Sequence, residues 1–348
     1  MYAIDFSFDL VYNSTKPIFE ATMESFIFAV NAVLPLILMA LLGYFLRRIN
    51  ILSEDMPKGL NKMLFRAILP CMMFKNVYDI EGFGDIGFGY IAYAVVAIFI
   101  VSLIAIPCVI ASSSKESRRG VLLQSVFRSN FALVGISLAT SLCGDRGAGV
   151  AALLAAFAVP IFNVMAVIAL SIFSDNKGKA SIKSILLDII KNPLIVSVLS
   201  AVAVIGVRAL FVKWGIEWRL SDVEPLFKVL DGLSDTATPI ALIALGAQFK
   251  FSAIGGMRRE IIFAVISRLV VVPLVALSVA YFFFDFEAVH FAAFIALFAT
   301  PVAVSSVPMT QEMGGDVELA GQVVVWSTAI SGFTIFLFTF VLKLLGVF

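Results

Sequence analysis

Charged residues are scarce in this sequence. Asp, Glu, Lys and Arg make up 14% of its 348 residues, against about 25% in an average soluble protein, whereas hydrophobic residues make up 61%. The formal net charge is only +1, so the chain lacks the basic stripe that nucleic-acid binding requires. A chain so poor in charge and so rich in apolar residues belongs inside a lipid bilayer.

Residues that build metal sites, disulfide frameworks and hydrolytic centres are equally few. The chain has one histidine, His290, and three cysteines, Cys71, Cys108 and Cys143, with no CxxC pair. No metal site, cofactor or disulfide framework is therefore expected. HExxH, GxSxG and GxxxxGK[ST] are also missing, which disfavours a membrane-embedded enzyme and an ATP-driven pump.

The first 25 residues lack the basic start of a secretory signal. They contain Asp5, Asp9 and Glu20 but only one basic residue, Lys16. We interpret residues 1–25 as an N-terminal extension.

Apolar runs long enough to cross a bilayer, about 20 residues each, recur along the rest of the chain. They predict an all-α integral membrane protein with ten transmembrane helices and no soluble domain between them. The predicted spans are 26–46, 59–78, 87–110, 121–143, 148–173, 184–207, 225–248, 260–284, 289–311 and 318–347.

The two halves of the chain resemble one another in pattern. RSNFALVGISLATSLCG in span four and ATPVAVSSVPMTQEMGG in span nine lie about 170 residues apart, so that Asn130 aligns with Thr300. Five spans in each half make the second half inverted relative to the first, as in many transporters. We predict a first five-helix repeat over 26–173, a cytoplasmic linker over 174–183 and an inverted repeat over 184–348.

Spans four and nine carry residues that interrupt a helix near the predicted middle of the bilayer. In span nine, Thr300 can cap a helix and Pro301 is tolerated at its first position, so we expect a half-helix to start there. Span four has a softer break around Asn130 and Gly135. The alternative is that prolines such as Pro308 only kink a continuous helix.

Non-helical backbone at that depth is tolerated only where it is buried in protein or lines a wet cavity. A half-helix that starts there presents free N–H groups and a partial positive charge. We therefore expect the two broken helices to cross at the midplane and to form a site for an anion. Ser137 and Ser305 can satisfy the loosened backbone and are further candidate substrate ligands.

Four ionisable residues inside the spans are candidates for function. Arg128 and Arg268 can each attract a carboxylate, and the alternative for both is snorkelling toward the interface. Asp231 and Asp235 lie on one helix face and are candidates for carrying a coupling proton. Their alternative is a solvated position near the outer end of span seven.

Three stretches resemble the auxin efflux carrier family. They are LPLILMALLGYFLRRINILSEDMPKGLNKMLFRAILPCMMFKNV (34–77), TPIALIALGAQF (238–249) and ATPVAVSSVPMTQEMGGDVELAGQVVVWSTAIS (299–331). The resemblance implies a fold shared with bile acid/sodium symporters. In that fold, spans one, two, six and seven form a scaffold, and spans three to five and eight to ten form a moving transport core. We also expect that the scaffold helices could form the interface of a homodimer.

The resemblance implies a secondary transporter of a small organic anion, such as an auxin-like carboxylate or a dicarboxylate, that alternates access around the crossing. The carried-over site residues are Asn130, Gly135, Asn163, Thr300 and Pro301. Where the family often has Gly-x-Pro, this chain has Gly-Ile-Ser at 135–137. Two alternatives stay open: a receptor or sensor of the same fold, and a sodium-coupled symporter of the bile-acid type. No sodium cage is evident, so a proton or no coupling ion is favoured.

The positions of Lys and Arg predict the orientation in the cell's inner membrane. Most of the 25 basic residues fall on one side, in the segments around 47–62, 115–119, 177–191 and 250–259. Because basic loops stay in the cytoplasm, ten spans place both termini outside it. In intact cells, a cysteine introduced by Lys179→Cys should be protected from an impermeant reagent. Preferential labelling of this position from outside would overturn the orientation.

Overall fold

The computed structural model describes residues 27–348 except 28–29, 32, 80–87, 174–186 and 188. The predicted N-terminal extension and the predicted linker over 174–183 lie outside the described residues. The described part of the chain is helical, and its only β-type pairing is an isolated bridge between Ser129 and Val302. The all-α fold is therefore confirmed.

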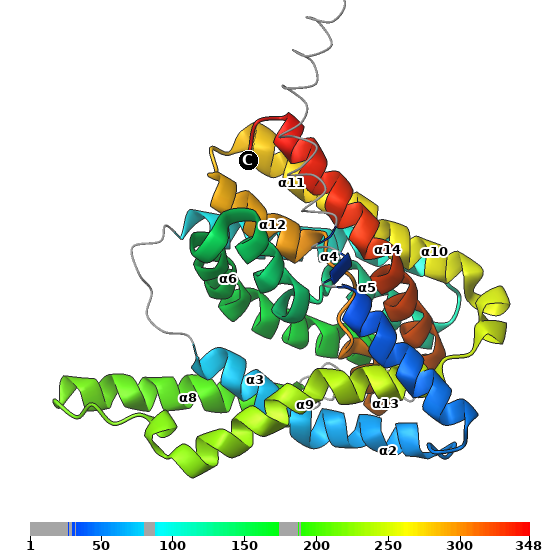
Figure 1. Ribbon diagram of the computed structural model, residues 1–348, viewed down its shortest axis with the longest axis horizontal. Coiled ribbons are helices and arrows are strands. Elements are labelled where there is room, and N and C mark those ends of the chain that lie inside the picture. The colour runs from blue at the N-terminus through cyan, green and yellow to red at the C-terminus, as the bar shows by residue number, and fades with distance from the viewer. Residues whose placement is uncertain (1–26, 28–29, 32, 80–87, 174–186, 188) are drawn as a thin grey trace, which may run out of the picture.

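The helices form two groups that lie against one another (Figure 1). One group is a layer, and the other is a bundle. The first group comprises 33–48, α2 (Met56–Met63), η1 (Leu64–Ile68), α3 (Leu69–Tyr78), α8 (Pro193–Lys213) and α9 (Glu224–Gln248). The bundle comprises α4 (Gly89–Ser112), α5 (Glu116–Phe127), η2 (Phe131–Gly135), α6 (Ile136–Ile172), α10 (Arg258–Ile266), η5 (Ser267–Val271), α11 (Val272–Phe283), α12 (Ala288–Phe298) and α14 (Val317–Leu344). The short helix α13 (Ser306–Glu312) packs on both α2 and α14.

Six helices of the described chain are long and apolar enough to cross a membrane. They are Gly89–Ser112, Ile136–Ile172, Pro193–Lys213, Glu224–Gln248, Phe251–Phe283 and Val317–Leu344. Several apolar helices of this kind indicate a multi-pass membrane protein. The count of ten spans and their inverted repeat stay predictions.

The helix α6 contains a sharp kink where predicted spans four and five meet. Cys143 and Gly144 leave helical geometry, and Gly144 has φ +60. Glycine adopts this left-handed conformation without the steric cost that a Cβ brings. The chain therefore reverses direction here without a longer loop.

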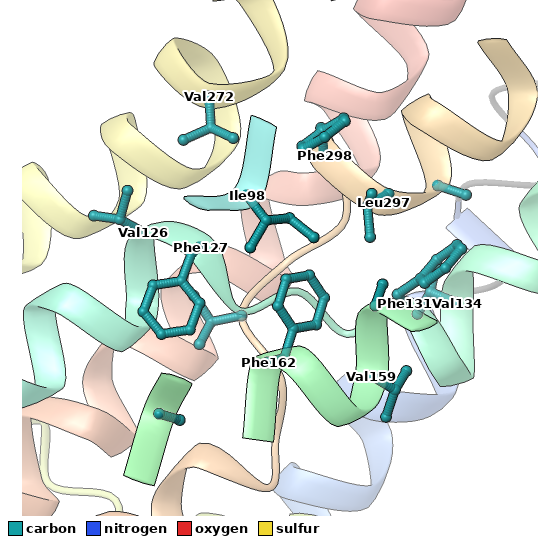
Figure 2. Close-up of a cluster of buried hydrophobic side chains, with 14 of the residues drawn as sticks. Ile98, Val126, Phe127, Phe131, Val134, Val159, Phe162, Val272, Leu297 and Phe298 are labelled. Carbon is teal, nitrogen blue, oxygen red and sulfur yellow. The ribbon is translucent and has the colours of Figure 1, made fainter. Parts of the chain in front are cut away.

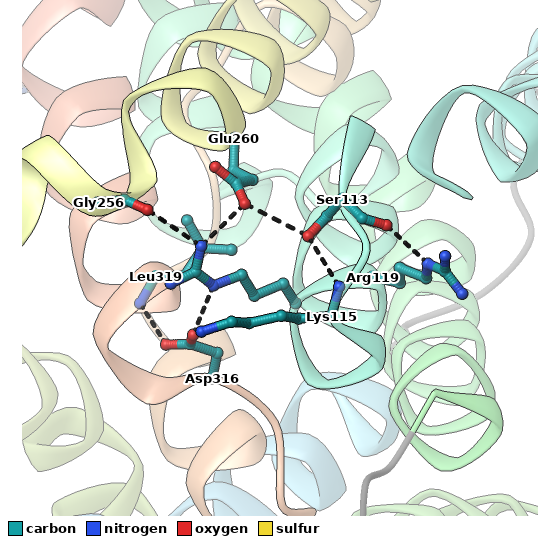
Figure 3. A network of polar contacts seen from close by, with 8 residues as sticks. Ser113, Lys115, Arg119, Gly256, Glu260, Asp316 and Leu319 are labelled. Atoms are coloured by element: carbon teal, nitrogen blue, oxygen red, sulfur yellow. Dashed lines mark hydrogen bonds and ion pairs between the residues drawn. The ribbon is translucent and has the colours of Figure 1, made fainter. Parts of the chain in front are cut away.

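A network of polar contacts that includes Glu260 and Asp316 ties one end of the bundle together (Figure 3). Arg118 Nε donates to Asp316 Oδ2 at 2.9 Å, and its Nη1 donates to Glu260 Oε1 at 2.8 Å and to Gly256 O at 3.2 Å. Asp316 Oδ1 also accepts from Leu319 N at 2.9 Å and so caps α14. One guanidinium thus links α5, α10 and α14.

Apolar side chains fill the bundle where α5, α6 and α12 approach one another (Figure 2). Phe127 and Phe162 stack with ring centroids 6.3 Å apart, and Phe131, Leu297 and Phe298 are buried beside them. Burying such side chains stabilises each by about 1.5–3 kcal/mol relative to water exposure. This packing keeps water away from the bundle side of the site described below.

The helix over 33–48 crosses α9 at backbone contact. A Cβ added to Gly246 would lie 1.8 Å from Ala40 O, and one added to Gly43 would lie 2.1 Å from Ile243 O. Small residues at such a crossing allow two helix backbones to approach closely. The layer therefore depends on glycine at both positions.

Gly246→Ala should lower the free energy of unfolding by about 1–3 kcal/mol, because the two helices must separate to admit the methyl group. The matched control is Gly232→Ala in the same helix, where a Cβ meets nothing within 4 Å. At that position alanine should be neutral or stabilising by up to about 1 kcal/mol. Thermal unfolding in detergent measures both, and equal melting temperatures for the two variants would contradict the close crossing.

Candidate substrate site

Two non-helical segments cross in the structure. The first spans 128–130 between α5 and η2, and the second spans 299–305 between α12 and α13. They run antiparallel: Asn130 N donates to Pro301 O at 2.8 Å, and Ala303 N donates to Arg128 O at 3.4 Å. The interruptions expected in spans four and nine are thus hydrogen-bonded to each other. Their depth in a membrane stays a prediction.

Arg268 holds together the helix ends at this crossing. Its side chain is fully buried, and Nη1 donates to Val126 O at 3.3 Å and to Phe127 O at 3.2 Å, at the end of α5. Nη2 donates to Leu297 O at 2.7 Å near the end of α12, and Nε donates to Thr300 O at 2.9 Å. The last carbonyls of a helix lack partners and favour a cation nearby. One guanidinium thus serves two helix ends.

Other hydrogen bonds satisfy the second break. Val302 N donates to Ser327 Oγ of α14 at 3.2 Å, and Thr300 Oγ1 donates back to Ala296 O at 2.8 Å. Ser327 lies in predicted span ten, and α13 separates it from the second break in the chain. From the sequence, only its hydroxyl within that span could have indicated this contact.

The expectation that a half-helix starts at Thr300-Pro301 is wrong, because α13 begins at Ser306. The backbone groups of residues 300–303 bond to Arg268, to the other break and to Ser327, so these residues stay extended and form no helix. Pro308 lies in the first turn of α13, where its missing N–H has no partner within a helix. It therefore does not kink a continuous helix.

A cavity of about 390 Å³ lies beside the crossing, between the layer and the bundle. Its size suits a small organic molecule. The bundle contributes Arg128, Ser129, Asn130, Val159, Phe162, Asn163, Ala303, Val304 and Ser305, and the layer contributes Leu69, Met72, Met73, Asn76, Ser234, Asp235, Ala237, Thr238, Pro239 and Ala241.

Five of the predicted site residues meet in this cavity: Arg128, Asn130, Asn163, Ser305 and Asp235. The other candidates do not line it. Each of these residues lies elsewhere and has other neighbours.

Gly135 is buried against its own turn and α12, since an added Cβ would lie 2.1 Å from the Phe131 ring and 3.2 Å from Ala296 O. Ser137 is exposed. Asp231 forms an ion pair with Lys75, whose Nζ lies 2.7 Å from Asp231 Oδ1.

Thr300, Pro301 and Arg268 build the crossing itself. Each is fully buried or nearly so, and the polar groups of all three face backbone atoms. These residues shape the site from behind the cavity wall.

Arg128 differs from Arg268 in the partners it has. Its side chain is also buried, yet Nη2 donates to Asn163 Oδ1 at 2.7 Å and to Ser305 Oγ at 2.9 Å, and Nη1 donates to Met309 Sδ at 2.7 Å. All three partners are neutral side chains, and the thioether is a weak acceptor. A buried cation without a counter-charge is costly. Arg128 thus brings to the cavity a positive charge that has no ion-pair partner among the described residues.

Asn130 adds a donor beside this charge. Its Nδ2 is buried and has no hydrogen-bond partner among the described residues. Asn163 has its own amide nitrogen fixed by Val159 O at 2.9 Å and by Met73 Sδ at 2.7 Å, which turns its oxygen to Arg128. The bundle side of the cavity therefore presents donors, which suit an anion.

A second cavity, of about 770 Å³, lies between the helix over 33–48, α9 and α14. It is more basic but its arginines have partners: Arg47 lies 3.7 Å from Glu54, and Arg48 donates to Tyr44 OH at 2.8 Å. It shares none of the crossing's residues. Across the described part of the chain, no cluster of three or more His, Cys, Asp or Glu is placed to hold a metal ion.

The sequence pattern of a family described as "Membrane transport protein" matches residues 28–339. The chain belongs to this family, the auxin efflux carriers. This carrier is also similar to an uncharacterized transporter of Methanothermobacter thermautotrophicus, with 22% identity over 322 residues that cover 88% of this chain and 96% of the relative. The predicted membership is confirmed, and the carrier is a multi-pass membrane transport protein.

Arg268→Ala should destabilise the carrier by about 3 kcal/mol or more, because four carbonyl oxygens lose their donor at once. The stability of Arg268→Lys should lie between that of the wild type and that of Arg268→Ala, since an ammonium group cannot reach all four carbonyl oxygens. Thermal unfolding and the monodisperse fraction after detergent extraction measure the effect. An Arg268→Ala protein with the wild-type melting temperature would show that the helix ends do not depend on this residue.

Proposed function

We propose that this carrier is a secondary transporter of a small organic anion, whose carboxylate binds Arg128 beside the crossing. Family membership supports transport, and the buried charge of Arg128, which has no ion-pair partner among the described residues, supports an anionic group on the substrate. This charge is the observation that carries the proposal.

Donors remain for a carboxylate at this place. A guanidinium has five N–H groups, and the three hydrogen bonds of Arg128 leave two of them without a partner among the described residues. The Nδ2 of Asn130 lies on the same cavity wall without a partner. Hydrogen bonds between an arginine and a carboxylate are about twice as strong as neutral ones. A bound carboxylate would therefore supply the missing counter-charge.

The two walls of the cavity suggest how access alternates. One wall belongs to the bundle and the other to the layer, so a shift between them would carry a substrate held by Arg128 past the layer. Three hydrogen bonds between α13 and the layer would have to open. Asn61 Nδ2 donates to Gln311 Oε1 at 2.9 Å, Gln311 Nε2 donates to Lys58 O at 3.0 Å, and Arg66 Nε donates to Glu312 Oε2 at 3.1 Å. Uptake into liposomes separates such a carrier from a non-transporting receptor.

Arg128→Gln should weaken binding of a carboxylate about 10–100-fold, because it removes a charged hydrogen bond worth about 1.5–3 kcal/mol. Arg128→Lys should recover part of the loss, since it restores the charge without the two-pronged geometry. Uptake into liposomes and ligand-induced thermal shifts measure the effect across a panel of small carboxylates.

The matched control is Arg146→Gln, which removes an exposed arginine paired with Glu287 at 2.7 Å. It should leave uptake unchanged. Full carboxylate uptake by a folded Arg128→Gln protein would remove the basis of the proposed function.

A further inference from the structure

The cavity at the crossing contains one acidic side chain as well as its arginine. Asp235 lines it from α9 in the layer, whereas Arg128 lines it from the bundle. These two are the charged residues of the lining, so their formal charges cancel. A site built for a dicarboxylate would be expected to carry an excess of positive charge instead.

Asp235 has no ion-pair or hydrogen-bond partner among the described residues. The nearby cation, Lys75, is instead 2.7 Å from Asp231, one helical turn away on the same helix. Lys75 does not line the cavity. Asp235 is exposed and lines the cavity, so a substrate can approach its carboxylate.

We infer that the preferred substrate is a zwitterion, an amino acid whose carboxylate binds Arg128 and whose ammonium group binds Asp235. This inference rests on the proposed function, because the substrate carboxylate binds Arg128 in both; it replaces an organic anion by an amino acid whose net charge is zero. An ammonium group has three donors. Asn76, Ser234 and Thr238 line the layer side with Asp235 and offer oxygen acceptors for the donors that Asp235 does not take.

The remaining wall indicates the side chain of this amino acid. Leu69, Met72, Met73, Val159 and Phe162 contribute apolar surface to the cavity. Apolar lining with a few placed polar groups is typical of sites that bind an apolar body in a fixed orientation. The side chain of the substrate is therefore apolar, whether aliphatic or aromatic.

Asp235 has a competing role as a carrier of a coupling proton. A proton carrier affects every substrate of the site, whether or not the substrate has an amino group. An ammonium ligand affects only substrates that have one. The two roles are therefore separated by comparing each amino acid with its deaminated carboxylic acid in the same protein.

The test uses the full chain in detergent and in liposomes, with leucine against 4-methylpentanoate, phenylalanine against 3-phenylpropanoate, and succinate as a dicarboxylate. In the wild-type carrier, at least one amino acid should bind about tenfold or more tightly than its deaminated partner, and succinate should bind weakly. In Asp235→Asn this ratio should fall to near one, while the deaminated acid binds as before. Glu224→Gln, a change in the same helix at a side chain 73% exposed, should leave the ratio unchanged.

Equal affinity of the wild-type carrier for both members of each pair overturns the inference, and so does an equal loss of both in Asp235→Asn. If these acids bind in an Arg128-dependent way without an amino preference, only the inference fails. If none of the amino acids, the deaminated acids or succinate binds, the proposed function fails together with the inference. Should Asp235→Asn not fold, the wild-type ratio alone decides.

Discussion

The crossing depends on the hydrogen bonds of one buried guanidinium. A helix that ends inside a packed bundle leaves its last carbonyls without donors, and water is not there to replace them. Arg268 supplies donors to the ends of α5 and α12 together, so one side chain satisfies carbonyls of both helix ends. The two breaks then satisfy each other and Ser327. The two interrupted helices are thus stabilised by the hydrogen bonds of Arg268, by the pairing of the two breaks and by Ser327.

This arrangement changes where an anion is recognised. Free N–H groups at two half-helix starts were expected to bind it, but the N–H groups of Asn130, Val302 and Ala303 already have partners in the crossing. Recognition is thus left to side chains that the crossing positions. The backbone of Arg128 takes part in the pairing, and its side chain turns to the cavity. The crossing fixes the place of the charge, and the layer opposite completes the site.

Local features of the sequence were enough to locate the helices and the breaks. The expected span 225–248 corresponds to Glu224–Gln248, and 87–110 corresponds to Gly89–Ser112, because apolar length is a local property. The different roles of the two buried arginines were not predictable, because both are single cations within apolar runs. Arg268 reaches Phe127 across 141 positions of the chain, and only packing decides such a contact. The start of α13 at Ser306 was not predictable for the same reason, since hydrogen-bond partners distant in the sequence keep residues 300–303 extended.

The proposed transport function requires that a substrate carboxylate binds Arg128 beside the crossing. The most direct measurement is a cryo-electron microscopy map of the carrier with a bound carboxylic or amino acid. Ligand density is expected in the cavity of about 390 Å³, with the carboxylate in hydrogen-bond contact with the Arg128 guanidinium and the Asn130 amide. Density in the larger basic cavity near Lys250, with the Arg128 side chain still bound only to protein groups, would contradict it.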